Sequence, residues 1–260
     1  MQYTIKQKPE QGGSARPGKR LEDSTMDYNN YDRGYAEPSM NASDYMTRTY
    51  RWMASGLLIT FAMAYITATT QLIYLVDSLY FVLTIAELAL VFVLSSRVQN
   101  MSVDAARATF FGYALLNGMV LSYYFIAFSV GTLVMAFLAT AVYFGLMAVY
   151  GTTTHKDLTG WGPRLMMALV AMIVTSLVGA LFGFGFGASV LYCGIGLVVF
   201  MLLTAYDTQK LRQIYAYYAG DAELAEKASI YGALTLYLDF INIFLYVVRL
   251  LGMNSRSRNN

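Results

Sequence analysis

Seven apolar stretches follow one another through most of this chain, and they constrain its fold more than any other feature of the sequence. They lie at about residues 52–72, 78–96, 108–128, 132–151, 164–184, 188–208 and 229–251. Each is close to the roughly 20 residues, at about 1.5 Å per residue, that a helix needs to cross a bilayer. Because lipid offers no partner to a backbone N–H or C=O group, such stretches must form helices. The sequence therefore predicts an all-α, polytopic membrane bundle of seven transmembrane helices.

Composition supports this class and excludes several others. Only 13% of the 260 residues are charged, about half the share in soluble domains. A net charge of +2 without a basic cluster gives no reason to expect a nucleic-acid partner. The single cysteine, Cys193, excludes a disulfide within the chain and a cysteine-based metal site. We expect the lipid bilayer as a partner and no cofactor.

The first 48 residues differ from the rest because they are polar, of mixed charge and without an apolar period. We predict a disordered cytoplasmic tail over residues 1–48 and a membrane domain over residues 49–253. The tail contains no apolar run of the kind found in a cleaved secretory signal. Targeting would then come from the first span.

Basic residues alternate between the two sides of the predicted bundle. The turns after the first, third and fifth stretches contain no Lys or Arg. The other side carries Arg48, Arg51, Arg97, Arg107, Lys156, Arg164, Lys210, Arg212 and Lys227. Since positive residues are enriched in cytoplasmic loops, this pattern predicts a cytoplasmic N-terminus.

The last stretch, Ser229–Leu251, has a polar stripe at helical spacing. Its members follow one another by three or four residues and are Gly232, Thr235, Asp239, Asn242, Tyr246 and Arg249. An ionised carboxylate at mid-membrane costs roughly 2.5–3.5 kcal/mol on the insertion scale, so it should face protein or water. We therefore predict that the last helix is central. Asp221 before a run of helix-forming residues predicts that this helix starts before the membrane.

Two acids, Asp207 and Asp239, lie on the last two predicted spans and could meet near the cytoplasmic side. Two close carboxylates cannot both ionise cheaply and tend to share one proton, so the pair could sense protons. It could also hold Ca²⁺, with Asn242, carbonyl groups or water completing the 6–8 oxygen ligands. We predict Asp207 and Asp239 as a proton-sensing cation pathway.

Two further residues are candidates for this pathway. Arg97, which closes the second span, could pair with a carboxylate and act as a latch. Glu87 lies within the same span without an assigned partner. Simpler interpretations stay open: Asp207 could lie at the interface beside Lys210, and Asp239 could be a hydrogen-bonded packing residue.

At these residues the sequence resembles the transmembrane Bax inhibitor motif (Bax inhibitor-1 like) family. The resemblance rests on AYDTQKL around Asp207, on TLYLDFINIFL from Thr235 to Leu245 and, less specifically, on ELALVFVLSSR from Glu87 to Arg97. It implies seven helices with the last wrapped by the other six. It also implies a pH-sensitive calcium leak, with the paired aspartates at Asp207 and Asp239 and an arginine latch near Arg97. A bacterial inner membrane is the implied location.

Two other functions remain possible readings of the sequence. Members of the resembled family are linked to restraining a membrane protease or a cell-death partner, so this chain could be a regulatory membrane protein. An intramembrane aspartyl protease would also place Tyr206-Asp207 on one helix and an acid on the next. That class expects a glycine-flanked second aspartate and a Pro-Ala-Leu motif, and neither occurs here. We therefore do not expect an enzyme.

Overall fold

A computed structural model of the chain describes residues 41–183, 189–218 and 220–258. The helices are α1 (Ala42–Thr69), α2 (Leu72–Arg97), α3 (Val103–Ala127), α4 (Val130–Thr153), α5 (Gly162–Phe182), α6 (Val190–Tyr218) and α7 (Ala222–Arg258). Short 3-10 turns, η2 (Val98–Asn100) and η3 (Thr159–Trp161), lie in two of the connections. The described residues form no strand. All seven α-helices are long and apolar enough to cross a membrane, which confirms the predicted fold class.

The membrane domain starts earlier than predicted. Asn41 caps α1, because its side chain accepts a hydrogen bond from the Asp44 N–H at 2.8 Å. Tyr45, one turn into the helix, is completely buried. Residues 42–48, which we assigned to the tail, therefore belong to α1. The rest of the predicted tail, residues 1–40, lies outside the described residues.

Local sequence signals explain where the other helices begin and end. Ser102 and Ser129 cap α3 and α4 by accepting from backbone N–H groups three residues later. Asp221 accepts from two N–H groups in the first turn of α7, at 2.9 and 3.0 Å, as the sequence predicts. Pro163 occupies the first turn of α5. That helix ends at Gly183, whose φ of 71° favours glycine.

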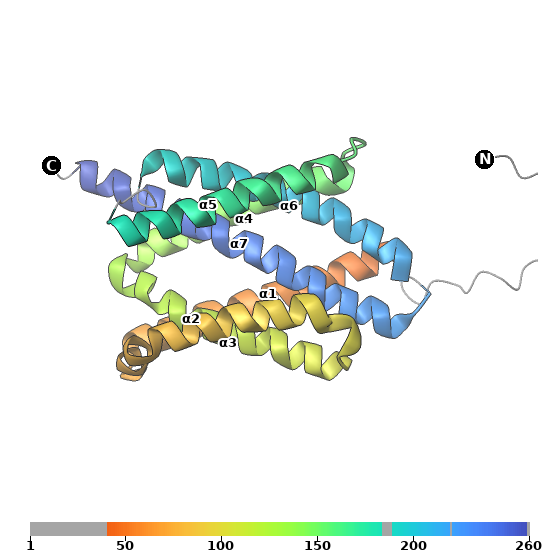
Figure 1. The fold of residues 1–260 in the computed structure, drawn as a ribbon, viewed down its shortest axis with the longest axis horizontal. Helices are drawn as coiled ribbons and strands as arrows, with labels where there is room; N and C mark the ends of the chain where they lie inside the picture. The colour runs from red at the N-terminus through yellow and green to blue at the C-terminus, as the bar shows by residue number, and fades with distance from the viewer. Residues whose placement is uncertain (1–40, 184–188, 219, 259–260) are drawn as a thin grey trace, which may run out of the picture. The chain divides into compact units, whose positions relative to one another are not determined.

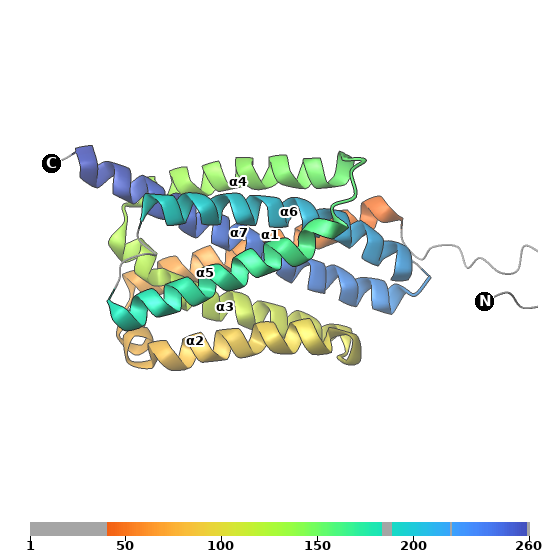
Figure 2. The same cartoon turned by 45° about the horizontal axis from the view of Figure 1, so that its top comes forward.

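Helix α7 is the central element of the bundle (Figures 1 and 2). It packs against α1, α2, α3, α4 and α6. Within its most apolar window 61% of the residues are buried, against at most 39% in any other helix and 6% in α2. The prediction of a central last helix is confirmed, although α5 packs mainly on α6 and not on α7.

Aromatic rings fill the space around α7, and small residues let some helix backbones approach closely. Phe240 of α7 packs against Phe137 and Phe144 of α4, with ring centroids 5.4 and 5.6 Å apart. Gly151 of α4 lies directly against the backbone of Ala205 on α6, where a Cβ atom would clash. This contact fixes α6 two residues before Asp207, which sets the position of that acid relative to α7.

The start of α1, the α2–α3, α4–α5 and α6–α7 connections, and the start of α7 lie together at the right of Figure 1. We call this side the basic end, because the nine basic residues predicted to face the cytoplasm lie in these segments or in the helix turns next to them. The basic residues that alternate along the sequence with turns free of Lys and Arg therefore gather at one end of the bundle.

Candidate functional site

A cavity of about 1210 Å³ lies among α2, α3, α5, α6 and α7. The polar stripe of α7 faces it: Thr235, Asp239, Asn242, Tyr246 and Arg249 all line the cavity. Glu87 of α2 and Asp207 of α6 line the same space. The structure therefore brings together most of the ionisable residues that the sequence placed inside the spans, and the stripe faces other helices as predicted.

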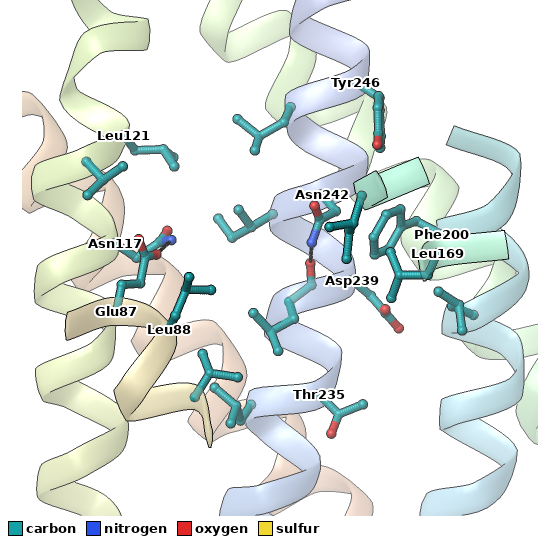
Figure 3. A pocket seen from close by; sticks show the side chains of 18 of the residues that line it. Glu87, Leu88, Asn117, Leu121, Leu169, Phe200, Thr235, Asp239, Asn242 and Tyr246 are labelled. Atoms are coloured by element: carbon teal, nitrogen blue, oxygen red, sulfur yellow. Dashed lines mark hydrogen bonds between the residues drawn. The ribbon is translucent and has the colours of Figure 1, made fainter. Parts of the chain in front are cut away.

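The two aspartates meet at the α6–α7 contact. Their carboxyl groups lie close enough to interact directly, side chain to side chain. Asp239 is only 4% exposed and points from α7 toward α6 (Figure 3). Asp207 is partly buried and lies 11 residues before the end of α6. The interpretation of Asp207 as an interface residue without coupling to Asp239 therefore does not fit the geometry.

Little around Asp239 compensates its charge. The Thr204 hydroxyl lies beside the carboxyl group, but it donates its one hydrogen to the Phe200 carbonyl at 2.8 Å. No described N–H or O–H group donates to Asp239 Oδ2, which is buried. A buried polar atom without a partner is costly, and such atoms concentrate at functional sites. The carboxyl group of Asp239 thus interacts with Thr204 and Asp207, while its Oδ2 atom has no hydrogen-bond partner among the described residues.

A cation lies beside Asp207, on the side of this acid that is nearer the basic end. Lys210, one turn further along α6, interacts electrostatically with Asp207 and lines the same cavity. Its ammonium group is exposed and lies 5.7 Å from the centre of the Tyr206 ring. A flexible lysine at this position can shield one carboxylate while leaving the deeper one, Asp239, without a cation.

Glu87 and Asn242 lie on different walls of the cavity (Figure 3). Glu87 accepts a hydrogen bond from the side-chain amide of Asn117 on α3. Asn242 donates to the Leu238 carbonyl of its own helix at 2.8 Å. The sequence analysis missed Asn117, although a buried amide inside an apolar span is a signal of the same kind as a mid-span acid.

The two arginines lie apart from the acid pair. Arg97 is exposed at the end of α2 and is not among the residues that line the cavity. The structure therefore does not bring the predicted latch residue to Asp207 or Asp239. Arg249 lines the cavity at the other end of α7 and donates to the Tyr124 hydroxyl at 2.9 Å. Arg249 is partly buried.

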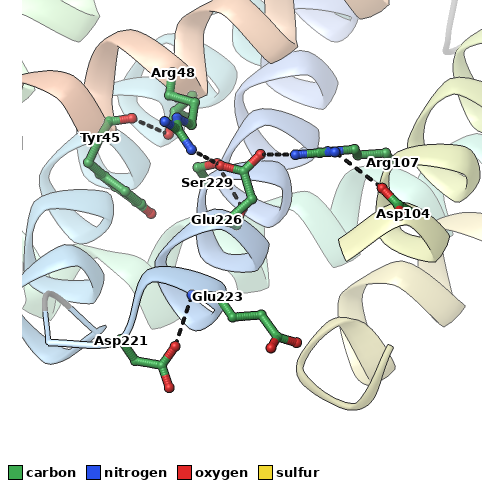
Figure 4. A network of polar contacts seen from close by, with 9 residues as sticks. Tyr45, Arg48, Asp104, Arg107, Asp221, Glu223, Glu226 and Ser229 are labelled. Atoms are coloured by element: carbon green, nitrogen blue, oxygen red, sulfur yellow. Dashed lines mark hydrogen bonds and ion pairs between the residues drawn. The ribbon is translucent and has the colours of Figure 1, made fainter. Parts of the chain in front are cut away.

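A second buried acid, Glu226, lies at the basic end and was also missed. It is 6% exposed and pairs with Arg48 of α1 and Arg107 of α3, the latter at 2.9 Å (Figure 4). Arg107 also lies over the Trp52 ring, 5.4 Å from its centre. The sequence showed the first turns of α7 only as good helix formers, and it could not show which acid faces inward.

The residues around the acid pair bear on whether a cation could be held there. Among the described residues no three His, Cys, Asp or Glu side chains gather closely enough to form a metal cluster. Two carboxylates supply only part of the 6–8 oxygen ligands that Ca²⁺ takes, so hydroxyl and carbonyl oxygens or water would supply the others.

Comparison with known proteins places this arrangement in a family. Residues 42–256 match the family model described as inhibitor of apoptosis-promoting Bax1. A protein of Deinococcus radiodurans is 45% identical over 79% of this chain and 89% of its own length. The inner membrane protein YbhL of Escherichia coli is 40% identical over 83% of this chain and 94% of its own length. A Rickettsia prowazekii protein is 39% identical over 80% of this chain and 89% of its own length. This chain therefore belongs to the Bax inhibitor-1 family and is a multi-pass membrane protein.

Proposed function

We propose that this protein is a pH-sensitive cation leak channel, with calcium as the main permeant ion and the Asp207–Asp239 pair as the gate. The observation that carries the proposal is the pairing of two acids on neighbouring helices, one of them buried with no hydrogen-bond partner on Oδ2 among the described residues. Both line a cavity of about 1210 Å³ that continues past Asn242 and Arg249.

The chemistry of the pair accounts for a response to pH. Two carboxylates in contact hold one proton between them more readily than either would alone. Gain or loss of this proton changes the charge of the pair by one unit. In a site with few compensating groups, that change alters both the attraction for a cation and the force between α6 and α7. A proton thereby controls the path that a calcium ion would follow.

The orientation of the channel follows from the charge on its surface. We propose that the basic end faces the cytoplasm, as the positive-inside rule predicts, and that the membrane is a bacterial inner membrane. The E. coli relative is named an inner membrane protein, which supports this location. On this orientation Lys210 and Asp207 lie on the cytoplasmic side of Asp239.

Flux measurements in vesicles test the proposal. The purified chain is reconstituted into liposomes that contain a calcium-sensitive dye, and calcium entry is recorded across the acid-to-neutral range. We expect flux that changes with pH in the native chain. In the double variant Asp207→Asn plus Asp239→Asn the flux should no longer depend on pH.

Matched controls make the result decisive. Asp104→Asn removes an acid whose side chain is 90% exposed and should leave the pH profile unchanged. If the double variant kept the native profile, the gate would not lie at this pair. Cleavage of a membrane protein added to the same vesicles, abolished by Asp239→Ala, would instead favour the aspartyl protease alternative.

A further inference from the structure

A continuous series of hydrogen-bonding groups runs from Glu87 in the cavity, past α7, to the contact between α1 and α3. The Asn117 amide nitrogen donates to Glu87, and the Asn117 amide oxygen lies 3.0 Å from the Tyr237 hydroxyl. The Tyr237 hydroxyl lies 2.6 Å from that of Thr60, which in turn lies 2.8 Å from the Ala114 carbonyl. Tyr237 and Thr60 are completely buried, and Asn117 is almost completely buried where it lines the cavity.

The two hydroxyl groups of this series have fewer hydrogens than there are contacts that need one. Tyr237 and Thr60 each have one hydroxyl hydrogen. Three contacts need one: Tyr237 with Asn117, Tyr237 with Thr60, and Thr60 with Ala114. When Glu87 is ionised and accepts from the amide, Tyr237 donates to Asn117, and the one hydrogen of Thr60 can go either to the Ala114 carbonyl or to the Tyr237 oxygen. One of the three contacts is then left without a hydrogen.

Protonation of Glu87 allows the opposite arrangement. The protonated carboxyl group can donate to the Asn117 oxygen after the amide has turned by half a rotation. The amide nitrogen then donates to the Tyr237 oxygen, Tyr237 donates to Thr60, and Thr60 donates to Ala114. Every contact in the series is then a hydrogen bond, and all of them point away from the cavity.

Few other groups that can gain or lose a proton face Glu87, so we assign the change of hydrogen-bond direction to the Asn117 amide. Tyr113 of α3 and Tyr237 of α7 can titrate and interact electrostatically with Glu87, and α1 contributes the neutral Thr60 to the series. On its own helix the next acid is Asp77, about 15 Å away along the axis. The other charged residues that line the cavity are Asp207, Lys210, Asp239 and Arg249.

We propose that Asn117, held by Tyr237 and Thr60, is a positioning residue that directs the Glu87 carboxyl group in the cavity and transmits its protonation state to the α1–α3–α7 contact. Gly118, the neighbour of Asn117, lies against the Thr60 backbone so closely that a Cβ atom would clash. This contact fixes the amide opposite the two hydroxyl groups. The inference rests on the proposed function only in that it gives Glu87 a role beside the ion path.

Thr60→Val tests the proposal, because it affects the two arrangements unequally. It removes one hydrogen bond when Glu87 is ionised, the one that the Thr60 hydroxyl group donates. It removes two when Glu87 is protonated, since Tyr237 also loses its acceptor. We expect the proton affinity of Glu87 to fall about fivefold, the effect of one net hydrogen bond, which moves its titration midpoint about 0.7 pH unit lower.

The measurement is infrared difference spectroscopy of the reconstituted full chain across a pH titration. The carboxylic acid C=O band of Glu87 is identified by its loss in Glu87→Gln. This readout does not depend on ion flux. The experiment can therefore contradict the proposed role of Asn117 without contradicting the proposed cation leak, and the reverse. Thr140→Val is the matched control, because Thr140 is completely buried and its hydroxyl group has no hydrogen-bond partner among the described residues.

Three results would support the proposed role of Asn117, Tyr237 and Thr60, and the opposite results would contradict it. Thr60→Val should shift the Glu87 band, whereas Thr60→Ser, which keeps the hydroxyl group, should restore the native midpoint. Thr140→Val should leave the midpoint unchanged. In an Asn117→Leu background, adding Thr60→Val should cause no further shift, since the connection is already broken. If Thr60→Val does not fold, Tyr237→Phe replaces it with the same expected direction. An unchanged midpoint in a folded variant contradicts the proposal.

Discussion

Helix α7 carries two buried acids whose surroundings differ in almost every respect. Glu226 is 6% exposed and lies between two guanidinium groups at the basic end. Asp239 is 4% exposed, lies about 20 Å further along the helix and meets another acid. The charge of Glu226 is compensated by an arginine on each side. Asp239, in contrast, has an oxygen without any hydrogen-bond partner among the described residues.

The difference is what we expect between an acid that stabilises the fold and one with the gating role that we propose for Asp239. Glu226 joins α7 to α1 and α3 through ion pairs, so its charge stabilises the contact that it makes. Asp239 contributes no such contact, and its burial opposes folding while it is charged. A fold retains an acid of the second kind when its unfavourable surroundings serve another purpose, such as responding to a proton.

The largest effect should follow from leaving Glu226 buried without its cations. We expect the double variant Arg48→Met plus Arg107→Met to lower the free energy of unfolding by about 3–5 kcal/mol, because an uncompensated buried charge then remains. The measurement is thermal or denaturant unfolding in detergent. Arg51→Met plus Arg97→Met is the matched control, since both side chains are exposed. Equal stability of the two double variants would mean that Glu226 does not depend on its partners.

A second prediction sets the two acids against each other directly. Glu226→Gln should destabilise the protein by about 1.5–3 kcal/mol, the contribution of hydrogen bonds to charged groups. Asp239→Asn should leave stability unchanged or increase it by about 1 kcal/mol, because the amide no longer brings a charge into the α6–α7 contact. Unfolding of both variants near neutral pH measures the two signs. Destabilisation of similar size in both would remove the distinction between them.

The sequence predicted the side of α7 that carries Asp239 because helical spacing alone decides it. Residues three or four apart share a face, so Thr235, Asp239 and Asn242 had to lie together. The scarcity of charge inside spans then made Asp207 the natural partner. The order of the helices brought the two together, since α6 and α7 are consecutive and antiparallel.

The parts that the sequence missed depend on contacts between distant segments. Nothing local tells Glu226 from Glu223, yet only the former faces Arg48 and Arg107, more than a hundred residues away. Arg97 was predicted to meet the acid pair because it ends a span, but η2 follows it and the side chain stays exposed. Which way a terminal residue points is decided by tertiary packing, and spacing along one helix does not reveal it.

An exposed acid provides the reference for both buried ones and gives the smallest expected effect. Asp157, in the α4–α5 connection, accepts from the Thr159 N–H at 2.8 Å. Hydrogen bonds from Thr159 lower the pKa of this carboxyl group. Because its pKa in the folded state lies below the unfolded value, the stabilisation is present above the unfolded-state pKa and is lost as the pH falls through the folded-state pKa.

Hydrogen exchange at the Thr159 amide measures this loss. We expect protection that decreases with acidity in the native chain and a pH-independent, lower protection in Asp157→Asn, after correction for the intrinsic exchange rate. Since solvent screens Asp157, the change should stay within the connection and leave global unfolding unaffected. A global effect would show that acids at the surface of this protein act on the whole bundle. The contrast between Glu226 and Asp239 could then no longer be attributed to burial and pairing alone.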